Sequence, residues 1–187
     1  METYVCFLRG INVGGNKIIP MTDLRRLFEK LGFGGVKTYI QSGNVVFRST
    51  ERKTSSLEKK IIEGIKNKFG FEVNVIVRSL RELQGVIASN PFAPGNSSLG
   101  VRTYFTLMLQ VPTREKLAEL EELRRLSKKG TSTDDDLKVI GSTIYVSCHK
   151  GWSKSPFNSS VTEKLLKVET TSRNFETMKK LEEIAKF

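Results

Sequence analysis

The residues best suited to chemistry in this chain lie in a glycine-rich segment near its N-terminus. From Arg9 to Lys17 the sequence reads Arg-Gly-Ile-Asn-Val-Gly-Gly-Asn-Lys. Glycines allow backbone N–H groups to converge on an anion, and the two cations would add charge-assisted hydrogen bonds. The segment therefore predicts an anion-binding loop with phosphate as its ligand. The candidate binding residues are Arg9, Asn12, Gly14, Gly15 and Lys17.

The spacing of this segment differs from that of established phosphate-binding motifs. Gly10 and Gly15 are separated as in a P-loop, but Lys17 comes one position late and no Ser or Thr follows it to hold magnesium. The pattern Gly-x-Gly-x-x-Gly is also absent. A second interpretation stays open, in which the glycines serve only the backbone conformation and the loop packs against a neighbouring module.

A polar turn supplies a second group of candidates. Gln41-Ser42-Gly43-Asn44 joins two apolar, strand-like runs and has the composition of a hairpin turn. In the alternative, functional interpretation, the side chains of Gln41, Ser42 and Asn44 contact the polar edge of a ligand.

A third group of polar and basic residues lies towards the C-terminus. It consists of Ser153, Lys154, Arg173 and Asn174. Ser153 and Arg173 are suited to phosphate binding, but hydrogen-bonded side chains of this kind also hold loops in place. Both interpretations stay open.

Several sharper kinds of chemistry are disfavoured by the composition. His149 is the only histidine and the chain has two cysteines, so no site built from several of these ligands can hold a metal, and we expect neither a metal nor a cofactor. Ser147-x-x-Lys150 matches the penicillin-binding motif, but it falls on a predicted strand and not at a helix start. The run from Asp134 to Asp136 lies in a polar loop and is expected to be solvated.

The elements that must position these residues follow from hydrophobic periodicity. Apolar runs rich in β-formers predict strands at 3–8, 36–40, 45–47 and 73–77. Helical spacing predicts helices at 24–31 and 57–69, each followed by a glycine. The order β-α-β-β-α-β is the ferredoxin-like pattern. Its first two strands run in the same direction, so we predict that loop 9–17 and turn 41–44 are neighbours.

The second half of the chain repeats this order in part. Strands are predicted at 102–111, 137–140 and 143–148, and helices at 113–126, 161–166 and 175–185, so a helix takes the place of the last strand. We predict an α+β fold with two ferredoxin-like β-α-β-β-α-β type modules in tandem, the second divergent, with extra C-terminal helices. The expected boundaries are 1–78 for the first module, 79–100 for a helix and linker, and 101–187 for the second.

The composition favours an anionic partner in a reducing compartment. The 187 residues carry a net charge of +11, of which residues 1–100 contribute +7 and residues 101–187 contribute +4. Such a balance suits a small anion or nucleic acid. Cys6 and Cys148 lie in apolar runs and are expected to be reduced and buried. The sequence shows no signal peptide and no apolar stretch of about 20 residues, so we expect a cytoplasmic protein without a membrane partner.

The signature segments resemble those of a known family. Leu8-Arg9-Gly10-Ile11-Asn12-Val13-Gly14-Gly15 and Tyr39-Ile40-Gln41-Ser42-Gly43-Asn44-Val45-Val46-Phe47 are similar to segments of the domain-of-unknown-function family numbered 1697. The stretches around Ser153-Lys154 and Thr170–Asn174 resemble its far end. The resemblance implies kinship and fold over nearly the whole chain, and it implies no catalytic residues.

Three hypotheses for the function follow. The first is a cytosolic binding module for a phosphate-bearing ligand, with nucleic acid as one form of it. An RNA-recognition module shares the predicted element order, but the third strand, Asn44-Val45-Val46-Phe47-Arg48, lacks the paired aromatics that stack on bases. The second is an enzyme for a small phosphorylated substrate that uses Arg9, Lys17 or Lys154 as electrostatic stabilisers. The third is a structural adaptor without a ligand.

Overall fold

The computed structural model describes residues 1–92, 101–130, 133–149 and 151–186. Their contacts divide the chain into two compact units. Unit 1 comprises residues 1–85 and 178–187, and unit 2 comprises residues 86–177. Residues 178–187 therefore group with unit 1, although they lie at the far end of the sequence, while the boundaries 1–78, 79–100 and 101–187 remain a prediction.

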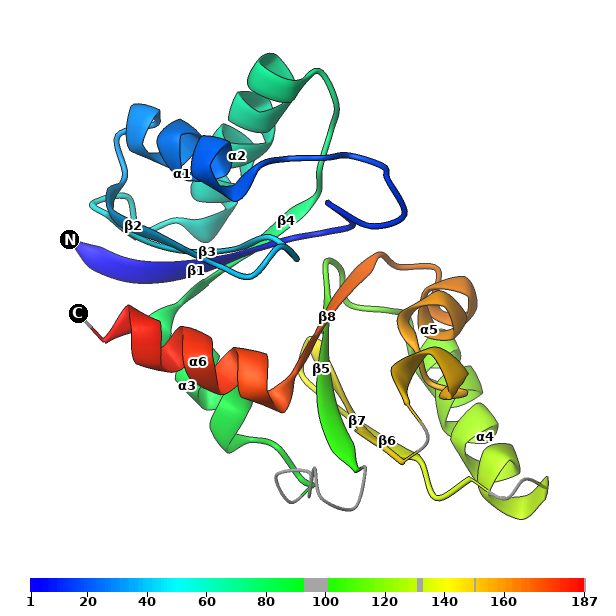
Figure 1. The fold of residues 1–187 in the computed structure, drawn as a ribbon. Helices are drawn as coiled ribbons and strands as arrows, with labels where there is room; N and C mark the ends of the chain where they lie inside the picture. The colour runs from blue at the N-terminus through cyan, green and yellow to red at the C-terminus, as the bar shows by residue number, and fades with distance from the viewer. Residues whose placement is uncertain (93–100, 131–132, 150, 187) are drawn as a thin grey trace. The chain divides into compact units, whose positions relative to one another are not determined.

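Unit 1 contains the complete ferredoxin-like order (Figure 1). Its elements are β1 (Glu2–Leu8), α1 (Met21–Lys30), β2 (Gly34–Tyr39), β3 (Asn44–Ser49), α2 (Thr54–Phe69) and β4 (Val75–Ser79). The four strands form an antiparallel sheet in the order β2-β3-β1-β4. The prediction of one antiparallel sheet with two helices in the first module is confirmed.

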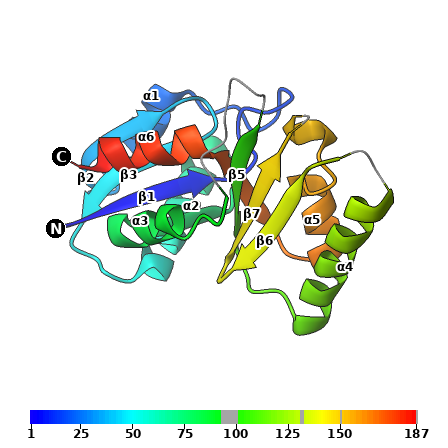
Figure 2. The same cartoon turned by 90° about the horizontal axis from the view of Figure 1, so that it is seen from below.

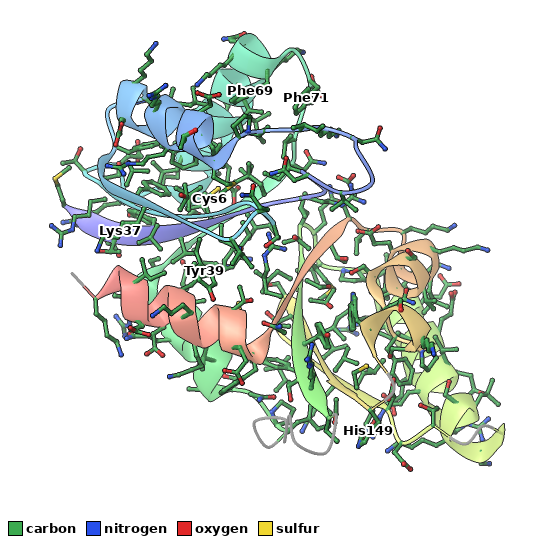
Figure 3. The ribbon with its side chains drawn as sticks, in the orientation of Figure 1. Cys6, Lys37, Tyr39, Phe69, Phe71 and His149 are labelled. Carbon is green, nitrogen blue, oxygen red and sulfur yellow. The ribbon has the colours of Figure 1, made fainter. Side chains whose placement is uncertain are left out.

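The core of unit 1 forms where α1 and α2 pack on one face of this sheet. Alternate residues of β1 and β3 point into it, among them Tyr4, Cys6 and Phe47, which are at most 1% exposed. Leu24 and Phe28 of α1 lie at helical spacing and join the same cluster. Figure 3 shows Cys6 between the sheet and the helices. Cys6 and Cys148 are buried and form no disulfide, as predicted.

The opposite face of the sheet is also buried. Val5, Phe7 and Val46 alternate with the residues above and have no exposed surface. The parts of α3 (Leu80–Ala88) and α6 (Phe175–Ala185) that belong to unit 1 cross this face (Figure 2). An RNA-recognition module binds bases on this open sheet face. Here the face is covered, so it offers no platform for RNA.

Unit 2 repeats the order and completes it. Its elements are β5 (Arg102–Met108), α4 (Arg114–Gly130), β6 (Asp136–Ile140), β7 (Thr143–Cys148), a short 3-10 helix (Trp152–Lys154), α5 (Ser159–Leu166) and β8 (Thr170–Asn174). The strands form a second antiparallel sheet in the order β6-β7-β5-β8. The α+β class with two modules is confirmed.

The expectation that a helix replaces the last strand of the second module is wrong. Residues 170–174 form β8, which pairs with β5 along its length, from Met108 opposite Thr170 to Tyr104 opposite Asn174. The sequence Thr-Thr-Ser-Arg-Asn has no apolar side chain and so shows no hydrophobic alternation. Hydroxyl contacts stabilise the strand instead, since the side-chain oxygens of Thr106 and Ser172 lie 2.7 Å apart.

One edge strand of each sheet, β4 in unit 1 and β8 in unit 2, has a backbone N–H that donates to a glutamate side chain. In unit 1, the Glu58 carboxylate of α2 accepts a hydrogen bond from the backbone N–H of Val77 in β4 at 2.9 Å. In unit 2, Glu163 of α5 accepts one from the backbone N–H of Thr170 in β8 at 2.7 Å. An occupied donor at a sheet edge disfavours pairing with another chain.

The Glu58 contact leads to a prediction about the pH dependence of stability. Burial raises the pKa of Glu58 above its ordinary value, although the hydrogen bond from Val77 acts in the opposite direction. Because the pKa is raised in the folded state, ionisation of Glu58 destabilises the folded protein. This destabilisation is absent below the unfolded-state pKa of about 4.3, and it is fully developed once the pH has risen through the folded-state pKa. Glu58→Gln keeps an acceptor without the charge. We expect the variant to be more stable than the wild type at pH 7.

Denaturant unfolding at pH 7 and at pH 3.5 measures this difference. The stability gain should shrink at the lower pH, where the wild-type carboxyl is protonated as well. Glu63→Gln, at an exposed position of the same helix, is the matched control and should change little. This expectation would be contradicted if the stability difference between Glu58→Gln and the wild type were smaller at pH 7 than at pH 3.5.

Candidate functional site

The predicted neighbourhood of the N-terminal loop and the β2–β3 turn is confirmed. The backbone N–H of Leu8 donates to the carbonyl of Gly43 at 2.8 Å. The side chain of Asn12 donates to the carbonyl of Gln41 at 2.9 Å. We call residues 9–20 and 40–44 together the unit 1 loop edge.

Unit 2 has an equivalent edge, which supports the interpretation of the two modules as repeats. The N–H of Met108 donates to the carbonyl of Ser142 at 3.0 Å, as Leu8 does to Gly43. The next residue repeats the pattern, because the N–H of Arg9 donates to Asn74 at 2.9 Å and that of Leu109 donates to Glu169 at 3.0 Å. Residues that differ between these two equivalent edges therefore point to properties that unit 1 has and unit 2 lacks.

Asn12 holds the unit 1 loop edge together. Its side-chain oxygen accepts from the N–H of Ile19 at 2.8 Å, and its amide donates to the carbonyls of Ile19 at 3.0 Å and Gln41 at 2.9 Å. It also has a φ of +57°, which asparagine tolerates better than most residues. This predicted ligand-binding amide is thus occupied by the loop itself.

The segment between Asn12 and Lys17 forms a small β-hairpin. Val13 and Asn16 form an antiparallel bridge, with the N–H of Asn16 donating to the carbonyl of Val13 at 3.1 Å. The two residues between them, Gly14 and Gly15, have φ values of +58° and +76°, as a two-residue turn with both central residues left-handed requires. The glycines predicted to cradle an anion therefore form the exposed tip of a hairpin.

The β2–β3 turn is built from buried contacts. A Cβ atom at Gly43, whose φ is +76°, would lie 2.8 Å from side-chain atoms of both Leu8 and Ile11. Asn44 is fully buried, and its amide donates to the carbonyl of Tyr39 and to the Ser42 hydroxyl at 3.1 Å each. Ser42 and Asn44 thus shape the turn, and the side chain of Gln41 is the exposed one among these three candidates.

Two cations and one neighbouring carboxylate set the local charge. Arg9 is half-buried, and the ammonium of Lys17 donates to the backbone carbonyl of Glu72 at 2.8 Å. The Glu72 carboxylate pairs with Lys66 at 2.6 Å, and the hydrogen bond from Lys66 lowers the pKa of Glu72. The Glu72 carboxylate is thus matched by Lys66, and the exposed ammonium of Lys17 adds positive charge beside it.

Exposed aliphatic side chains are the feature that sequence reasoning missed. Val13 is 65% exposed, Ile18 is 64% exposed and Ile40 is 48% exposed. Ile40 also has a φ of +47°, a strained conformation for a β-branched residue. The sequence does contain a sign of this exposure, because Val13 and Ile18 flank two glycines in a segment too polar to be a buried strand.

The C-terminal candidates all lie in unit 2. Ser153 and Lys154 are exposed on the 3-10 helix. Arg173 is only 8% exposed and donates to the Thr171 hydroxyl at 2.8 Å and to the carbonyl of Ser172 at 2.9 Å. Asn174 caps α6 by accepting from the N–H of Thr177 at 2.8 Å. Arg173 and Asn174 thus have local structural contacts, and ligand binding by all four residues stays a prediction.

The expectation that the acidic run at 134–136 is solvated is wrong for two of its residues. Asp135 is 1% exposed and accepts from the N–H of His149 at 2.7 Å. Asp136 forms ion pairs with Arg124 and Lys128 of α4. Sequence context showed only a polar loop, whereas the partners, Arg124 and Lys128 of α4 and the backbone of His149, lie in other parts of the chain. No group of three or more His, Cys, Asp or Glu suited to a metal occurs among the residues that the structure describes.

Open grooves in the described part of the chain lie along the outer strands. One of about 680 Å³ follows β2 in unit 1, and one of about 600 Å³ follows β6 in unit 2. Lys37, labelled in Figure 3, lines the first. None of the twelve candidate residues lines either groove. Within the described ranges, no helix is both long and apolar enough to span a bilayer.

The two repeats define an α+β protein with tandem ferredoxin-like modules. A family model described as "Protein of unknown function (DUF1697)" matches residues 1–145. The chain therefore belongs to this family, as the resemblance of its signature segments predicted.

Among solved structures, the chain is similar to the conserved bacterial protein SP0830 from Streptococcus pneumoniae. The two share 22% sequence identity with a TM-score of 0.69, and the match covers 99% of each chain. At this identity the likeness shows the fold alone. No curated protein matches the sequence.

Proposed function

We propose that the protein binds nucleic acid, and that unit 1 makes the contact through its loop edge. The observation that carries this proposal is the charge of that edge. The exposed Lys17 lies in segment 9–20, and neither this segment nor segment 40–44 contains an Asp or Glu. Electrostatic contact with phosphates, which does not depend on the base sequence, supplies a large share of the affinity in such complexes.

The distribution of charge between the units supports the same proposal. Unit 1 contains 18 Lys and Arg against 10 Asp and Glu, whereas unit 2 contains 13 against 10. On α4 of unit 2, four cations are paired with carboxylates: Lys116, Arg124, Arg125 and Lys128. On α2 of unit 1, Lys59 and Lys60 have no carboxylate partner in the described part of the chain. Unit 1 therefore has the more positive surface, which favours an anionic partner.

The composition of the loop edge argues against the enzyme hypothesis. A hydrolase or transferase needs a general acid or base within hydrogen-bond reach of its substrate. Segments 9–20 and 40–44 contain no His, Cys, Asp or Glu. The amides of Asn12 and Asn44 are occupied by backbone carbonyls. The edge thus retains cations and a projecting hairpin, which suit binding better than catalysis.

Fluorescence anisotropy with labelled single- and double-stranded oligonucleotides tests the proposal. We expect the logarithm of affinity to fall linearly with the logarithm of salt concentration, with a slope of roughly −2 to −4 for a few phosphate contacts. Lys17→Ala should reduce the magnitude of this slope by about one. Lys128→Ala, which removes a lysine paired with Asp136 in unit 2, is the matched control and should leave the slope unchanged. No binding at low salt and high micromolar protein would refute nucleic-acid binding.

A further inference from the structure

The unit 1 loop edge leaves large aliphatic side chains exposed to solvent in the folded protein. Apart from Met1, the exposed large hydrophobic residues in the described part of unit 1 are Val13, Ile18 and Ile40. Val13 lies on the hairpin, Ile18 directly follows Lys17 at its base, and Ile40 directly precedes Gln41, whose carbonyl accepts a hydrogen bond from Asn12. The rest of the loop is anchored by buried residues, since Ile11 and Ile19 are at most 1% exposed.

Hydrogen bonds and close packing anchor the segment that carries this aliphatic surface. The Asn12 side chain donates two hydrogen bonds and accepts one, and together with the close packing at Gly43 these contacts attach the hairpin to the sheet. Left-handed conformations at Lys17 and Ile40 persist only because their surroundings determine them. A preorganised surface loses little conformational entropy when it binds. The hairpin therefore presents Val13 and Ile18 to a partner at low cost.

The chemistry of the partner follows from the two kinds of side chain at this edge. The exposed Lys17 attracts phosphates, while Val13 and Ile18 need apolar surface, which in nucleic acid is the face of a base. Segments 9–20 and 40–44 contain no Phe, Tyr or Trp, so stacking of bases on aromatic rings is not available. Aliphatic wedges instead enter base steps that are already unstacked or easily unstacked.

Resting on the proposed function, we propose that the hairpin at residues 13–18 is an apolar wedge that contacts bases, and that the ligand is nucleic acid with unpaired or mismatched bases. Phosphate contact by Lys17 positions the ligand. Contact with the bases by Val13 and Ile18 selects its conformation, because less energy is needed to open a step that lacks normal pairing.

The test compares four labelled oligonucleotides of equal length: a perfect duplex, a duplex with a central mismatch, a duplex with a central gap, and a single strand. The wild type should bind the mismatched and gapped duplexes roughly three- to tenfold more tightly than the perfect one. The double variant Val13→Ser/Ile18→Ser should lose this preference and keep the salt slope, which counts phosphates alone. A thermal melt should show unchanged stability, because both side chains are exposed.

Val111→Ser is the matched control for the apolar substitution. Val111 is 73% exposed and lies in the loop after β5, the equivalent of the unit 1 loop, in the less basic unit. This variant should keep both the preference and the slope.

Two outcomes overturn the wedge and leave the proposed function intact. One is equal affinity of the wild type for perfect and mismatched duplexes, and the other is a double variant that keeps the preference. A double variant that binds every oligonucleotide as the wild type does, but changes its state of association in sedimentation, would assign the aliphatic surface to a protein contact and also overturn the wedge. Absence of binding to all four oligonucleotides is different, because it refutes the proposed function itself.

Discussion

Gly43→Ala is expected to lower the free energy of unfolding by about 3 kcal/mol. Two costs add at this position. The φ of +76° is unfavourable for any residue with a Cβ atom, and that atom would lie 2.8 Å from Leu8 and Ile11, both of which are buried. Because Leu8 belongs to β1, relief of the clash would disturb the strand that pairs with both β3 and β4. Thermal unfolding should show a melting temperature lower by roughly 6–12 °C.

Gly141→Ala separates the two costs. Gly141 has a φ of +58° in the β6–β7 turn of unit 2, and a Cβ atom there would meet nothing within 4 Å. It should therefore show only the conformational cost, about 1–2 kcal/mol. Equal destabilisation by the two substitutions would mean that the contact of the turn with Leu8 and Ile11 contributes nothing, and that the loop edge is less firmly held than its geometry indicates.

Asn12→Ala is expected to cost about 2–3 kcal/mol. The buried N–H of Ile19 would lose its acceptor, and the carbonyls of Ile19 and Gln41 would lose their donor. Alanine is also less favourable than asparagine at a φ of +57°. Since the hairpin would lose its attachment to the β2–β3 turn, oligonucleotide affinity should fall together with the melting temperature.

Asn16→Ala is the control for the Asn12 substitution. Asn16 is exposed on the same hairpin, so its replacement should change stability by less than about 0.5 kcal/mol. If Asn12→Ala instead melts like the wild type and loses only ligand binding, the amide serves a ligand and not the loop. That result would restore the interpretation of Asn12 as a binding residue.

Together the two substitutions distinguish the residues that build the loop edge from those that act on it. Gly43 and Asn12 should change stability and binding together, because the hairpin depends on them. Lys17, Val13 and Ile18 are exposed and should change binding alone. Exposed side chains that are not needed for folding are the ones on which a binding function can rest.

The order of elements in residues 1–78, and the neighbourhood of loop 9–17 and turn 41–44, could be predicted from the amino-acid sequence. Both depend on local patterns, since the alternation of Val73, Val75 and Val77 and the helical spacing of Leu24, Leu27 and Phe28 are visible within a few residues. Antiparallel topology then brings the ends of β1 and β2 to one edge without further information.

Which of the candidate residues remain exposed could be seen only in the folded protein. Asn12 and Asn44 looked like ligand-binding amides because a sequence does not show which backbone carbonyls lie near a side chain. Strand β8 has no apolar residue and exists because β5 provides a partner for its backbone, and Asp135 is buried by contacts from other elements. Residues 178–187 likewise group with unit 1 through contacts made far along the chain. In each case the stabilising free energy comes from pairing and burial between segments that are distant in the sequence, and a local sequence pattern does not show such contacts.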